Sequence, residues 1–544
     1  MRVPELIARF ARAQGLEHFF GLPGSGLLMD LMEEGRKAGL RFVSVAHESS
    51  AAVAAAYYGH RKGCAGLAVA IRGPGAANLA SGAATAYFER RPVVCLCECS
   101  PQQEGTPPSA QICDHEALFS AVAKHRATLT AQRAAEVLRE CFAAAAEGRP
   151  GPVLLDVPSG LTGADGEAAP EATHADSSPE PPNPANLRAL AETLRGFNRP
   201  VVIAGADVLR ARARRELAEV VERLGAAVLV ATEARGLYPE DHPRFAGVFS
   251  NLAEPNVLGN LIMDRADGAL LVGMDPLMAE RPWHRSLPAC ELVARRCYTG
   301  MCPSPLGRVD GDLRASLGAL LELELLPPAP RLGYHPESIA STRTQALRAF
   351  ARPPGAALAV QDVIAAARRL LPAEGMLFSE TGVFVLMLEH LWPVTLPDTF
   401  FGTAGGRTMG LMIPAILGAG LARPGTPMVG IGGDASTLMR LGELETFARA
   451  RVAVPLVIVN DGCLGTIGAR QKARALPRWG VELAPVDFAA VARGCGLSGV
   501  QVRTPQELER ELQAAFGRDR ATVLDVRVDP EAYRDSFVAT TGAR

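Results

Sequence analysis

Residues 428–468 hold two short apolar runs that a helical pattern separates. The first run ends at Asp434, inside the small-residue turn Gly-Gly-Asp-Ala-Ser, and the second ends at Asp461. Between the runs, apolar residues from Leu438 to Ala448 recur every three or four positions, which predicts a helix. Because the strands of a strand–helix–strand unit are parallel, their carboxyl ends open into one crevice, where such folds bind ligands. The stretch therefore predicts an α/β fold with Asp434 and Asp461 at the mouth of a ligand site.

The residue types around this crevice indicate what it binds. Small residues on both sides of Asp434 leave backbone amides exposed at the start of a helix, an arrangement that favours phosphate. Two carboxylates beside a phosphate suit Mg²⁺, a hard cation that takes oxygen ligands. The alternative is an ordinary strand–helix–strand unit with aspartate caps.

The length of the chain requires more than one core. A chain of 544 residues exceeds what a single hydrophobic core usually supports. Two proline-rich stretches without periodicity, 161–186 and 326–337, are typical of linkers. Each part between them alternates helical patterns with short apolar strands, which favours parallel sheets. We therefore expect three doubly wound parallel-sheet α/β domains, at 1–165, 183–326 and 340–544.

The composition excludes several classes of protein. A formal net charge of −2 argues against a nucleic-acid binder or a basic membrane-surface protein. No apolar run reaches the roughly 18 residues of a membrane span, and the amphipathic start of the chain lacks the apolar core of a signal peptide. We expect a cytoplasmic protein. Cys95, Cys97 and Cys99 share one face of a strand, where buried thiols are favoured over a zinc site.

Residues 433–461 resemble the cofactor motif of the thiamine-diphosphate enzymes, of the acetolactate synthase and benzoylformate decarboxylase kind. The Gly-Asp-Gly and Asn-Asn elements of that motif correspond to Gly433-Asp434-Ala435 and Asn460-Asp461. The front of the chain resembles the pyrimidine-binding domain of these enzymes at 21–24, 47–48 and 73–78. The resemblance implies three domains of the thiamine-diphosphate-enzyme type: pyrimidine-binding, central and diphosphate-binding.

The resemblance also implies cofactor and metal ligands. Mg²⁺ would be held by Asp434, Asp461 and the backbone carbonyl of Cys463. Met409 would support the cofactor in a bent shape, and the Arg407 carbonyl would accept a hydrogen bond from its amino group. The other residues implied to bind thiamine diphosphate are Glu48, Gly75, Thr381, Gly382, Gly433, Ala435, Ser436, Leu464 and Gly465.

Two side chains of the front third are implied to be catalytic. Glu48 would hydrogen-bond the pyrimidine ring and, by general acid–base catalysis, help the cofactor to lose the proton of its reactive carbon. Gln111 would face the reacting centre. For His115, a role there and a plain surface or capping histidine both stay open. Because the family takes the glutamate and the metal motif from different subunits, a homodimer or homotetramer is implied.

The resemblance implies a function: thiamine-diphosphate- and Mg²⁺-dependent cleavage or formation of a carbon–carbon bond on a small 2-oxo acid. Decarboxylation and acetolactate synthase-like carboligation both fit, and the substrate and the acceptor stay open. FAD is not expected, because the central third lacks the loop of the flavin-binding relatives. A flavin-dependent oxidase relative and a non-catalytic binding protein of this fold are the alternatives.

Three places depart from the family pattern or extend it. Val385 and Leu386 stand where acetolactate synthases have Gln and His against the diphosphate. Arg407 stands where glycine is common, and its side chain either meets a substrate carboxylate or faces solvent. Arg470 and its basic neighbours follow the metal motif, where a solvated basic face is the favoured interpretation.

Overall fold

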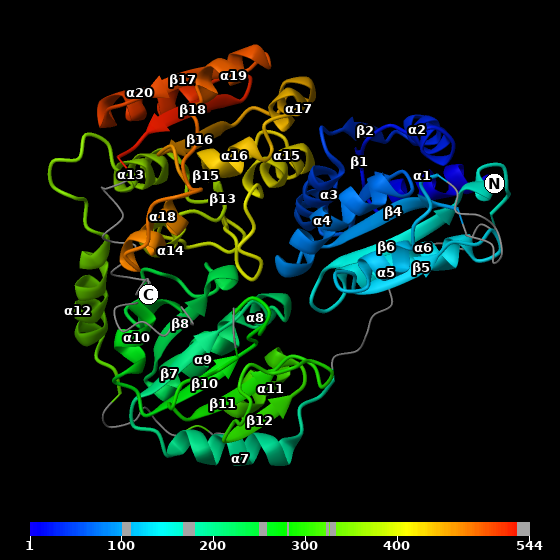
Figure 1. The fold of residues 1–544 in the computed structure, drawn as a ribbon. Coiled ribbons are helices and arrows are strands. Elements are labelled where there is room, and N and C mark those ends of the chain that lie inside the picture. Colours follow the sequence, from blue (N-terminus) through cyan, green and yellow to red (C-terminus); the bar gives the residue numbers. More distant parts are fainter. Residues whose placement is uncertain are drawn as a thin grey trace.

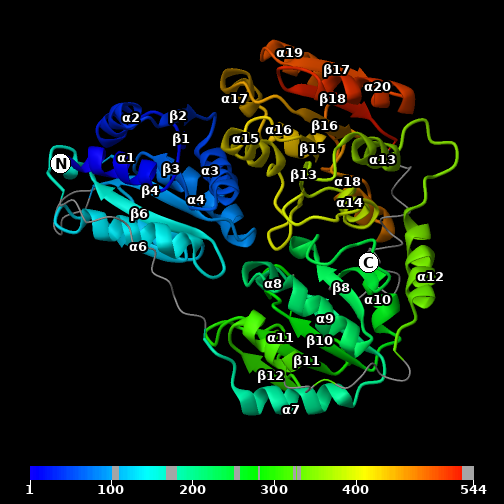
Figure 2. The same ribbon diagram turned by 180° about the vertical axis from the view of Figure 1, so that it is seen from behind.

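The fold consists of three six-stranded β-sheets, each flanked by helices (Figures 1 and 2). The computed structural model describes residues 1–100, 110–166, 180–249, 258–279, 282–322, 326 and 333–529. Neighbouring strands within each sheet run parallel. The predicted class, three doubly wound parallel-sheet α/β units, is confirmed. The domain boundaries at 165, 183, 326 and 340 stay predictions.

The first sheet has the strand order β2-β1-β3-β4-β6-β5. Its strands are β1 (His18–Gly21), β2 (Arg41–Ser44), β3 (Gly66–Ala70), β4 (Val93–Cys99), β5 (His125–Thr128) and β6 (Pro152–Pro158). Its helices are α1 (Val3–Ala13), α2 (Leu27–Lys37), α3 (Glu48–Lys62), α4 (Pro74–Phe88), α5 (His115–Phe119) and α6 (Ala134–Ala146), and the 3₁₀ turn η1 (Ser159–Leu161) follows β6. Cys95 and Cys97 lie buried in β4, as a core strand requires.

The third sheet repeats the first one strand for strand, with the order β14-β13-β15-β16-β18-β17. Its strands are β13 (Met376–Ser379), β14 (Phe400–Phe401), β15 (Met428–Gly433), β16 (Pro455–Asn460), β17 (Ser498–Val502) and β18 (Thr522–Arg527). Its helices are α13 (Val360–Leu370), α14 (Val385–Leu391), α15 (Met412–Ala422), α16 (Asp434–Leu438), α17 (Glu443–Ala450), α18 (Gly465–Ala473), α19 (Phe488–Gly494) and α20 (Pro505–Phe516); α12 (Pro336–Leu347) and η3 (Arg348–Phe350) precede them.

The central sheet has a different order, β12-β11-β10-β7-β8-β9, which from the other edge is the strand order of dinucleotide-binding folds. Its strands are β7 (Pro200–Ala204), β8 (Ala227–Ala231), β9 (Phe245–Phe249), β10 (Gly268–Val272), β11 (Ala289–Val293) and β12 (Gly307–Asp310). Its helices are α7 (Pro184–Arg195), α8 (Asp207–Arg210), α9 (Arg214–Leu224), α10 (Leu258–Met263) and α11 (Leu313–Glu322), with η2 (Thr232–Ala234) after β8.

Two sequence-based expectations need correction. The helix expected over 438–448 is broken between α16 and α17, where the amides of Arg440 and Glu443 each donate to the carbonyl three residues earlier, at 3.0 Å. In this turn the Arg440 side chain donates to the Gly410 carbonyl at 3.1 Å. The first predicted linker ends earlier than expected, since residues 184–186 already belong to α7, whose first amides are capped by Asn183. Half of each predicted linker, 167–179 of the first and 327–332 of the second, lies outside the described residues.

The first and third parts of the chain meet where α3 packs against α15. Val53 and Tyr57 of α3 belong to an apolar cluster with residues of the third sheet. A methyl group added at Gly418 of α15 would collide with the Ala54 carbonyl oxygen, so the two helices approach backbone to backbone. Arg440 spans this contact, since it also donates to Ser49 Oγ at 2.6 Å. The start of α3 is thereby fixed against the loops of the third sheet.

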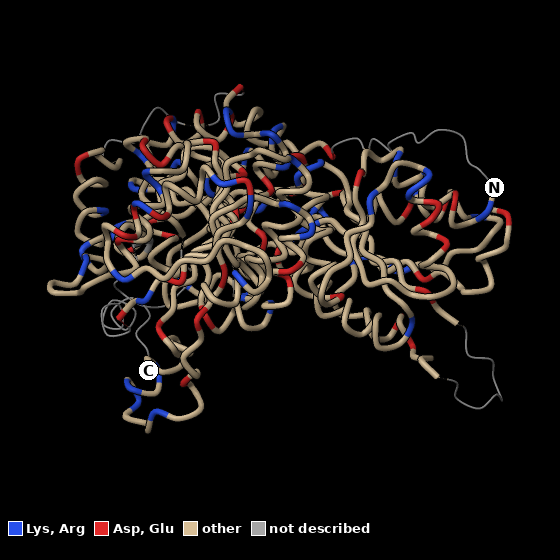
Figure 3. The backbone as a smooth tube through the Cα atoms, turned by 90° about the horizontal axis from the view of Figure 1, so that it is seen from above, with Lys and Arg blue, Asp and Glu red and all other residues tan. Residues whose placement is uncertain are grey.

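The surface carries both signs of charge. Figure 3 shows Lys and Arg interspersed with Asp and Glu over all three parts of the chain. None of the helices in the described residues is both long and apolar enough to cross a membrane. The predicted cytoplasmic location stays a prediction.

Candidate cofactor site

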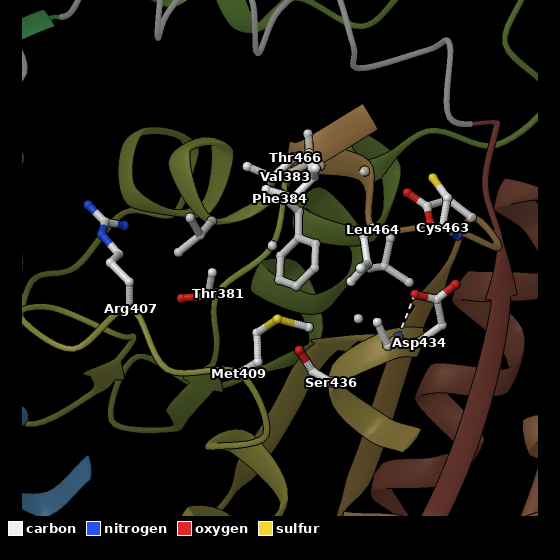
Figure 4. Close-up of a pocket in the computed structure, with 18 of the residues that line it drawn as sticks. Thr381, Val383, Phe384, Arg407, Met409, Asp434, Ser436, Cys463, Leu464 and Thr466 are labelled. Atoms are coloured by element: carbon white, nitrogen blue, oxygen red, sulfur yellow. Dashed lines mark hydrogen bonds between the residues drawn. The ribbon is translucent and has the colours of Figure 1, made fainter. Parts of the chain in front are cut away.

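A cavity of about 480 Å³ opens at the carboxyl edge of the third sheet, where the strand order reverses between β13 and β15 (Figure 4). Ligands of parallel α/β sheets bind at such a reversal. All the cofactor and metal residues predicted in the last third of the chain line this cavity. The lining residues are Thr381, Gly382, Val383, Phe384, Val385, Leu386, Arg407, Met409, Gly433, Asp434, Ala435, Ser436, Val459, Asp461, Cys463, Leu464, Gly465, Thr466, Ile467 and Arg470.

Asp434 and Asp461 follow β15 and β16 directly, so the two carboxylates lie at one end of the cavity. Asp434 accepts the amides of Ala435 at 2.6 Å and Gly462 at 2.7 Å. Burial raises the pKa of Asp434 above its ordinary value. The pKa of Asp461 is raised to about 7, first by burial and then by repulsion from Asp434. The pair therefore carries an electrostatic strain that a bound cation would relieve.

The loop after β16 presents a backbone oxygen beside these carboxylates. The Leu464 amide donates to the Val481 carbonyl at 2.7 Å, and the Leu483 amide donates to the Gly462 carbonyl at 2.9 Å. These two backbone bonds use Gly462 and Leu464, the residues on either side of Cys463, and the Cys463 amide donates to Asp461 at 3.0 Å. The Cys463 carbonyl takes no part in these bonds, so it can serve as a third oxygen ligand.

Glu380 is a buried acid that the sequence reasoning did not assign to the site. It follows β13, is 1% exposed, and accepts the Met412 amide at 3.3 Å. Burial raises its pKa to about 7, although nearby backbone amides, that of Met412 first, oppose this shift. Glu380 therefore bonds to the start of α15 and packs closely against Gly432, two residues before Asp434.

The remaining walls are mostly apolar. Phe384 and Leu464 project over the cavity, and Met409 lies close to Ser436 on its other side (Figure 4). Val385 and Leu386, at the start of α14, offer no hydrogen bond to a phosphate. Polar contacts to a diphosphate would then come from backbone amides and from hydroxyl groups such as that of Ser436.

Arg407 lies at the opposite end of the cavity from Cys463 (Figure 4). Its backbone has φ +43°, in the left-handed region that favours glycine. Its guanidinium forms an ion pair with Glu389 of α14 at 3.3 Å, and its side chain is about one-third exposed. The sequence left open whether the Arg407 side chain meets a substrate carboxylate or faces solvent. The ion pair with Glu389 shows that solvent is not its sole partner.

The loop that carries Arg407 is held from the first part of the chain. Glu89, at the end of α4, is 1% exposed and accepts the Ala404 amide at 3.1 Å. Burial raises the pKa of Glu89 to about 7, in spite of the nearby Arg91 and Arg407 charges. The partners lie more than three hundred residues apart, so no local pattern could have indicated this contact.

Glu48 and Gln111 do not line this cavity within one chain. Glu48 is the first residue of α3, is 7% exposed, and accepts a hydrogen bond from Asn78 Nδ2 at 3.0 Å. Gly75 lies beside it, because a methyl group there would come within 3.3 Å of Glu48 Oε1. Gln111 has φ +64° and is exposed. The structure thus brings Glu48 and Gly75 together, apart from the cavity of their own chain.

Comparison with known proteins assigns the chain to a family. Three models match in order: the N-terminal TPP binding domain of thiamine pyrophosphate enzymes at residues 1–118, the central domain at 187–291, and the C-terminal TPP binding domain at 380–526. The chain belongs to the thiamine pyrophosphate enzymes. The predicted three-domain type of this family is therefore confirmed, thiamine pyrophosphate being another name for thiamine diphosphate.

Curated relatives of this thiamine pyrophosphate enzyme are similar over almost their whole length. An acetolactate synthase large subunit of Parasynechococcus marenigrum (strain WH8102) is 28% identical, over 95% of this chain and 86% of the relative. A catabolic acetolactate synthase of Raoultella terrigena is 28% identical, over 98% and 95%. A probable 2-ketoarginine decarboxylase of Pseudomonas aeruginosa is 30% identical, over 96% and 93%.

The residues of the cavity fit the cofactor that this family implies. Small residues at Gly433, Ala435 and Gly465 leave the backbone accessible to a diphosphate. Two carboxylates and a carbonyl oxygen are the donor set that Mg²⁺ prefers. The raised pKa of Asp461, caused by burial and by Asp434, is the behaviour expected of carboxylates placed for a cation.

At the reversal point of the central sheet, the Gly205 amide donates to the Val272 carbonyl at 2.9 Å. Arg149 from the first part enters the same place, donates to Asp207 at 3.0 Å and pairs with Asp275 at 3.4 Å. Arg90 and Arg210 pair with the same two carboxylates, so charges of both signs lie at this point. The predicted absence of FAD stays a prediction.

Proposed function

We propose that this enzyme uses thiamine diphosphate and Mg²⁺ to decarboxylate a small 2-oxo acid, alone or with transfer of the product to a second carbonyl compound. One observation carries the proposal: Asp434, Asp461 and Cys463 line one cavity together with Met409, and Asp461 lies close enough to bond to the Cys463 amide and to be repelled by Asp434. When bound, thiamine diphosphate supplies a carbon nucleophile and an electron sink for the loss of CO₂.

In this proposal each group of the cavity has a defined task. Asp434, Asp461 and the Cys463 carbonyl hold Mg²⁺, and the amides of Gly382, Gly433, Ala435, Leu464 and Gly465 with the hydroxyls of Thr381 and Ser436 hold the diphosphate. Met409 would support the cofactor from below, and the Arg407 carbonyl would accept a hydrogen bond from its amino group. The apolar walls exclude water, which strengthens these charged contacts.

Glu48 acts as the acid that hydrogen-bonds the pyrimidine ring, and Gly75 leaves room beside it. Since Glu48 does not line the cavity of its own chain, we propose that two chains associate and that Glu48 and Gln111 of one complete the site of the other. A homodimer is the smallest assembly that meets this requirement, and a homotetramer also does.

The lining side chains favour some substrates over others. Two relatives are named for acetolactate synthesis, which joins two carbonyl compounds, and one for decarboxylation of 2-ketoarginine. The cavity ends in Arg407 and its rim carries Arg470, so a substrate with a cationic tail would be repelled. We propose a 2-oxo acid with a neutral apolar or anionic tail.

The proposal includes no flavin cofactor, because the central third has no clear equivalent of the loop that flavin-binding relatives carry. A purified protein with flavin absorbance would favour the oxidase alternative. Absence of Mg²⁺-dependent cofactor binding in calorimetry would favour a non-catalytic protein.

The test compares Glu48→Gln with Glu33→Gln, an exposed glutamate of the same part of the chain that pairs with Arg36. Turnover of pyruvate, 2-oxobutyrate, benzoylformate and 2-ketoarginine is measured with cofactor and Mg²⁺. We expect Glu48→Gln to lose about 100-fold or more in turnover, with cofactor affinity within a few-fold of wild type and Glu33→Gln unchanged. Equal turnover of all three proteins would remove Glu48 from the mechanism.

A further inference from the structure

His115 lies buried between two groups of the first part of the chain. Its side chain is 2% exposed, and its Nδ1 lies 2.8 Å from Asp156 Oδ1 in β6. Its Nε2 accepts the Gly73 amide at 3.2 Å. An amide N–H only donates, so Nε2 carries no hydrogen and Nδ1–H donates to Asp156. The aspartate therefore fixes the tautomer in which His115 is an acceptor toward Gly73.

A metal site is the other interpretation of this cluster. Cys97, His115 and Asp156 have ligand atoms within 4.8 Å of one another. Both imidazole nitrogens are already engaged, one by Asp156 and one by Gly73. A cation would have to displace one of these hydrogen bonds, so the geometry describes an anchored histidine rather than a metal ligand.

Gly73 is the point through which His115 reaches the two proposed catalytic segments. It is the N-cap of α4 and has φ +66°. A methyl group at Gly73 would lie 2.6 Å from the Gln111 carbonyl oxygen, so the Gln111 segment packs directly on this residue. The start of α4 then carries Gly75, which leaves room beside the Glu48 carboxylate, and Asn78, which donates to that carboxylate at 3.0 Å.

We propose that His115 is a positioning residue: by accepting the Gly73 amide, it holds the first turn of α4 against Glu48 and the Gln111 segment against the same turn. This inference rests on the proposed function of Glu48. Without the acceptor, the Gly73 amide is left buried and unpaired, and the turn that bears Asn78 and Gly75 loses its fixed start. The effect on the reaction is then exerted through Glu48, because His115 itself is shielded from the ligand.

Two substitutions separate this role from simple core packing. The amide oxygen of Gln reaches about as far along the side chain as Nε2, so His115→Gln keeps an acceptor for Gly73. Asn reaches only as far as Nδ1, so His115→Asn keeps a polar group toward Asp156 and loses the acceptor. We expect His115→Gln to retain kcat within about threefold, and His115→Asn to lose about ten- to a hundredfold in kcat with KM nearly unchanged.

A readout that needs neither cofactor nor turnover accompanies the kinetics. In hydrogen–deuterium exchange of the apoprotein, His115→Asn is expected to raise exchange of the peptide over 72–79, while peptides of α15 stay at wild-type rates. His115→Gln is expected to match wild type in both. Thermal unfolding checks that each variant is folded, and Asp156→Asn, which retains an acceptor for Nδ1–H, serves as a second probe with an intermediate effect.

The outcomes distinguish this inference from the proposed function. If wild type turns over no 2-oxo acid but the 72–79 peptide still responds to His115→Asn, the proposed function fails and the anchoring of Gly73 stands. If wild type is active and the two His115 variants behave alike, in kinetics or in exchange, then the acceptor at Nε2 has no positioning role and the inference is overturned.

Discussion

Asp434 Oδ2 accepts the Gly462 amide hydrogen at 2.7 Å. This bond joins the loop after β15 to the loop after β16, so the carboxylate that leads the first loop also fixes the second. Since Asp461 and Cys463 flank Gly462, the whole proposed set of metal ligands is connected by one side chain before any ion binds.

Replacing Asp434 should therefore affect metal and cofactor together. We expect Asp434→Asn to weaken Mg²⁺-dependent binding of thiamine diphosphate by about 100-fold or more, because it removes a charged ligand of the metal. Changes to residues that only support metal ligands typically reduce metal affinity by about 10- to 100-fold, and the loss of a ligand itself should reduce it further. Calorimetric titration with and without Mg²⁺ measures this. Asp519→Asn, at a surface position that is 86% exposed, is the control and should bind as wild type does. Unchanged affinity in Asp434→Asn would contradict the assigned metal site.

The apoprotein should lose stability as the pH rises. The pKa of Asp461 is raised to about 7 from 3.8 by burial and by Asp434. Its protonated form therefore stabilises the folded protein fully below about pH 4, and this stabilisation is lost as the pH rises to about 7. We expect the apoprotein Tm to fall between pH 5 and 8, and Asp461→Asn to raise the Tm at pH 8 by about 2–4 °C. Mg²⁺ should reverse the loss at pH 8 in wild type. A flat Tm profile without Mg²⁺ would refute this prediction.

Glu380 should matter through its hydrogen bonds rather than through contact with a ligand. Glu380→Ala leaves the buried Met412 amide without the carboxylate oxygen that accepts it at 3.3 Å, at about 1–3 kcal/mol for an unsatisfied group. We expect the free energy of unfolding in denaturant to fall by about 1–3 kcal/mol. Glu380→Gln keeps one acceptor oxygen and should lose less. A smaller loss for Ala than for Gln would show that the carboxylate is not the anchor of these loops.

Arg407 allows a matched pair of substitutions. Gly and Ala both remove the guanidinium and its ion pair with Glu389, but only Ala keeps the cost of φ +43°. We expect Arg407→Gly to be more stable than Arg407→Ala by about 1 kcal/mol in denaturant unfolding. A rise in KM for acidic 2-oxo acids that both variants share would report on the lost guanidinium. If the two variants are equally stable, the backbone strain at Arg407 has been misjudged.

The packing of the first part of the chain against the central part should depend on Asp275, which pairs with two arginines of the first part. This carboxylate is fully buried and pairs with Arg90 at 2.7 Å and Arg149 at 3.4 Å. Asp275→Asn leaves two guanidinium groups without that charge, so we expect a loss of about 3–5 kcal/mol in the free energy of unfolding. The control is Asp310→Asn in the pair with Arg308, whose side chains are 27% and 31% exposed, where about 1 kcal/mol or less is expected. Similar losses in the two variants would argue against a buried joint.

The sequence was informative wherever the determinant is local. Apolar runs, helical spacing and the acids after two strands predicted parallel sheets and a site at Asp434 and Asp461, and the family resemblance added Met409, which lines the same cavity. Contacts between distant segments left no such trace. Glu89 and Ala404, Arg440 and Ser49, and His115 and Gly73 meet only after folding, and each partner alone has the composition of an ordinary cap or surface residue. The break between α16 and α17 was not predicted, because the apolar spacing of Leu438, Leu441 and Leu444 continues through it and does not show where the backbone tightens into a turn.

The backbone contact between Gly418 of α15 and Ala54 of α3 limits which substitutions this chain can accept during evolution. Most helix contacts tolerate exchange of one apolar side chain for another, because neighbours can shift to refill the volume. Here one partner is a main-chain carbonyl, which no exchange of side chains can move aside. Any larger residue at position 418 would push the first and last thirds of the chain apart. Position 418 must therefore remain glycine even where the surrounding sequence changes.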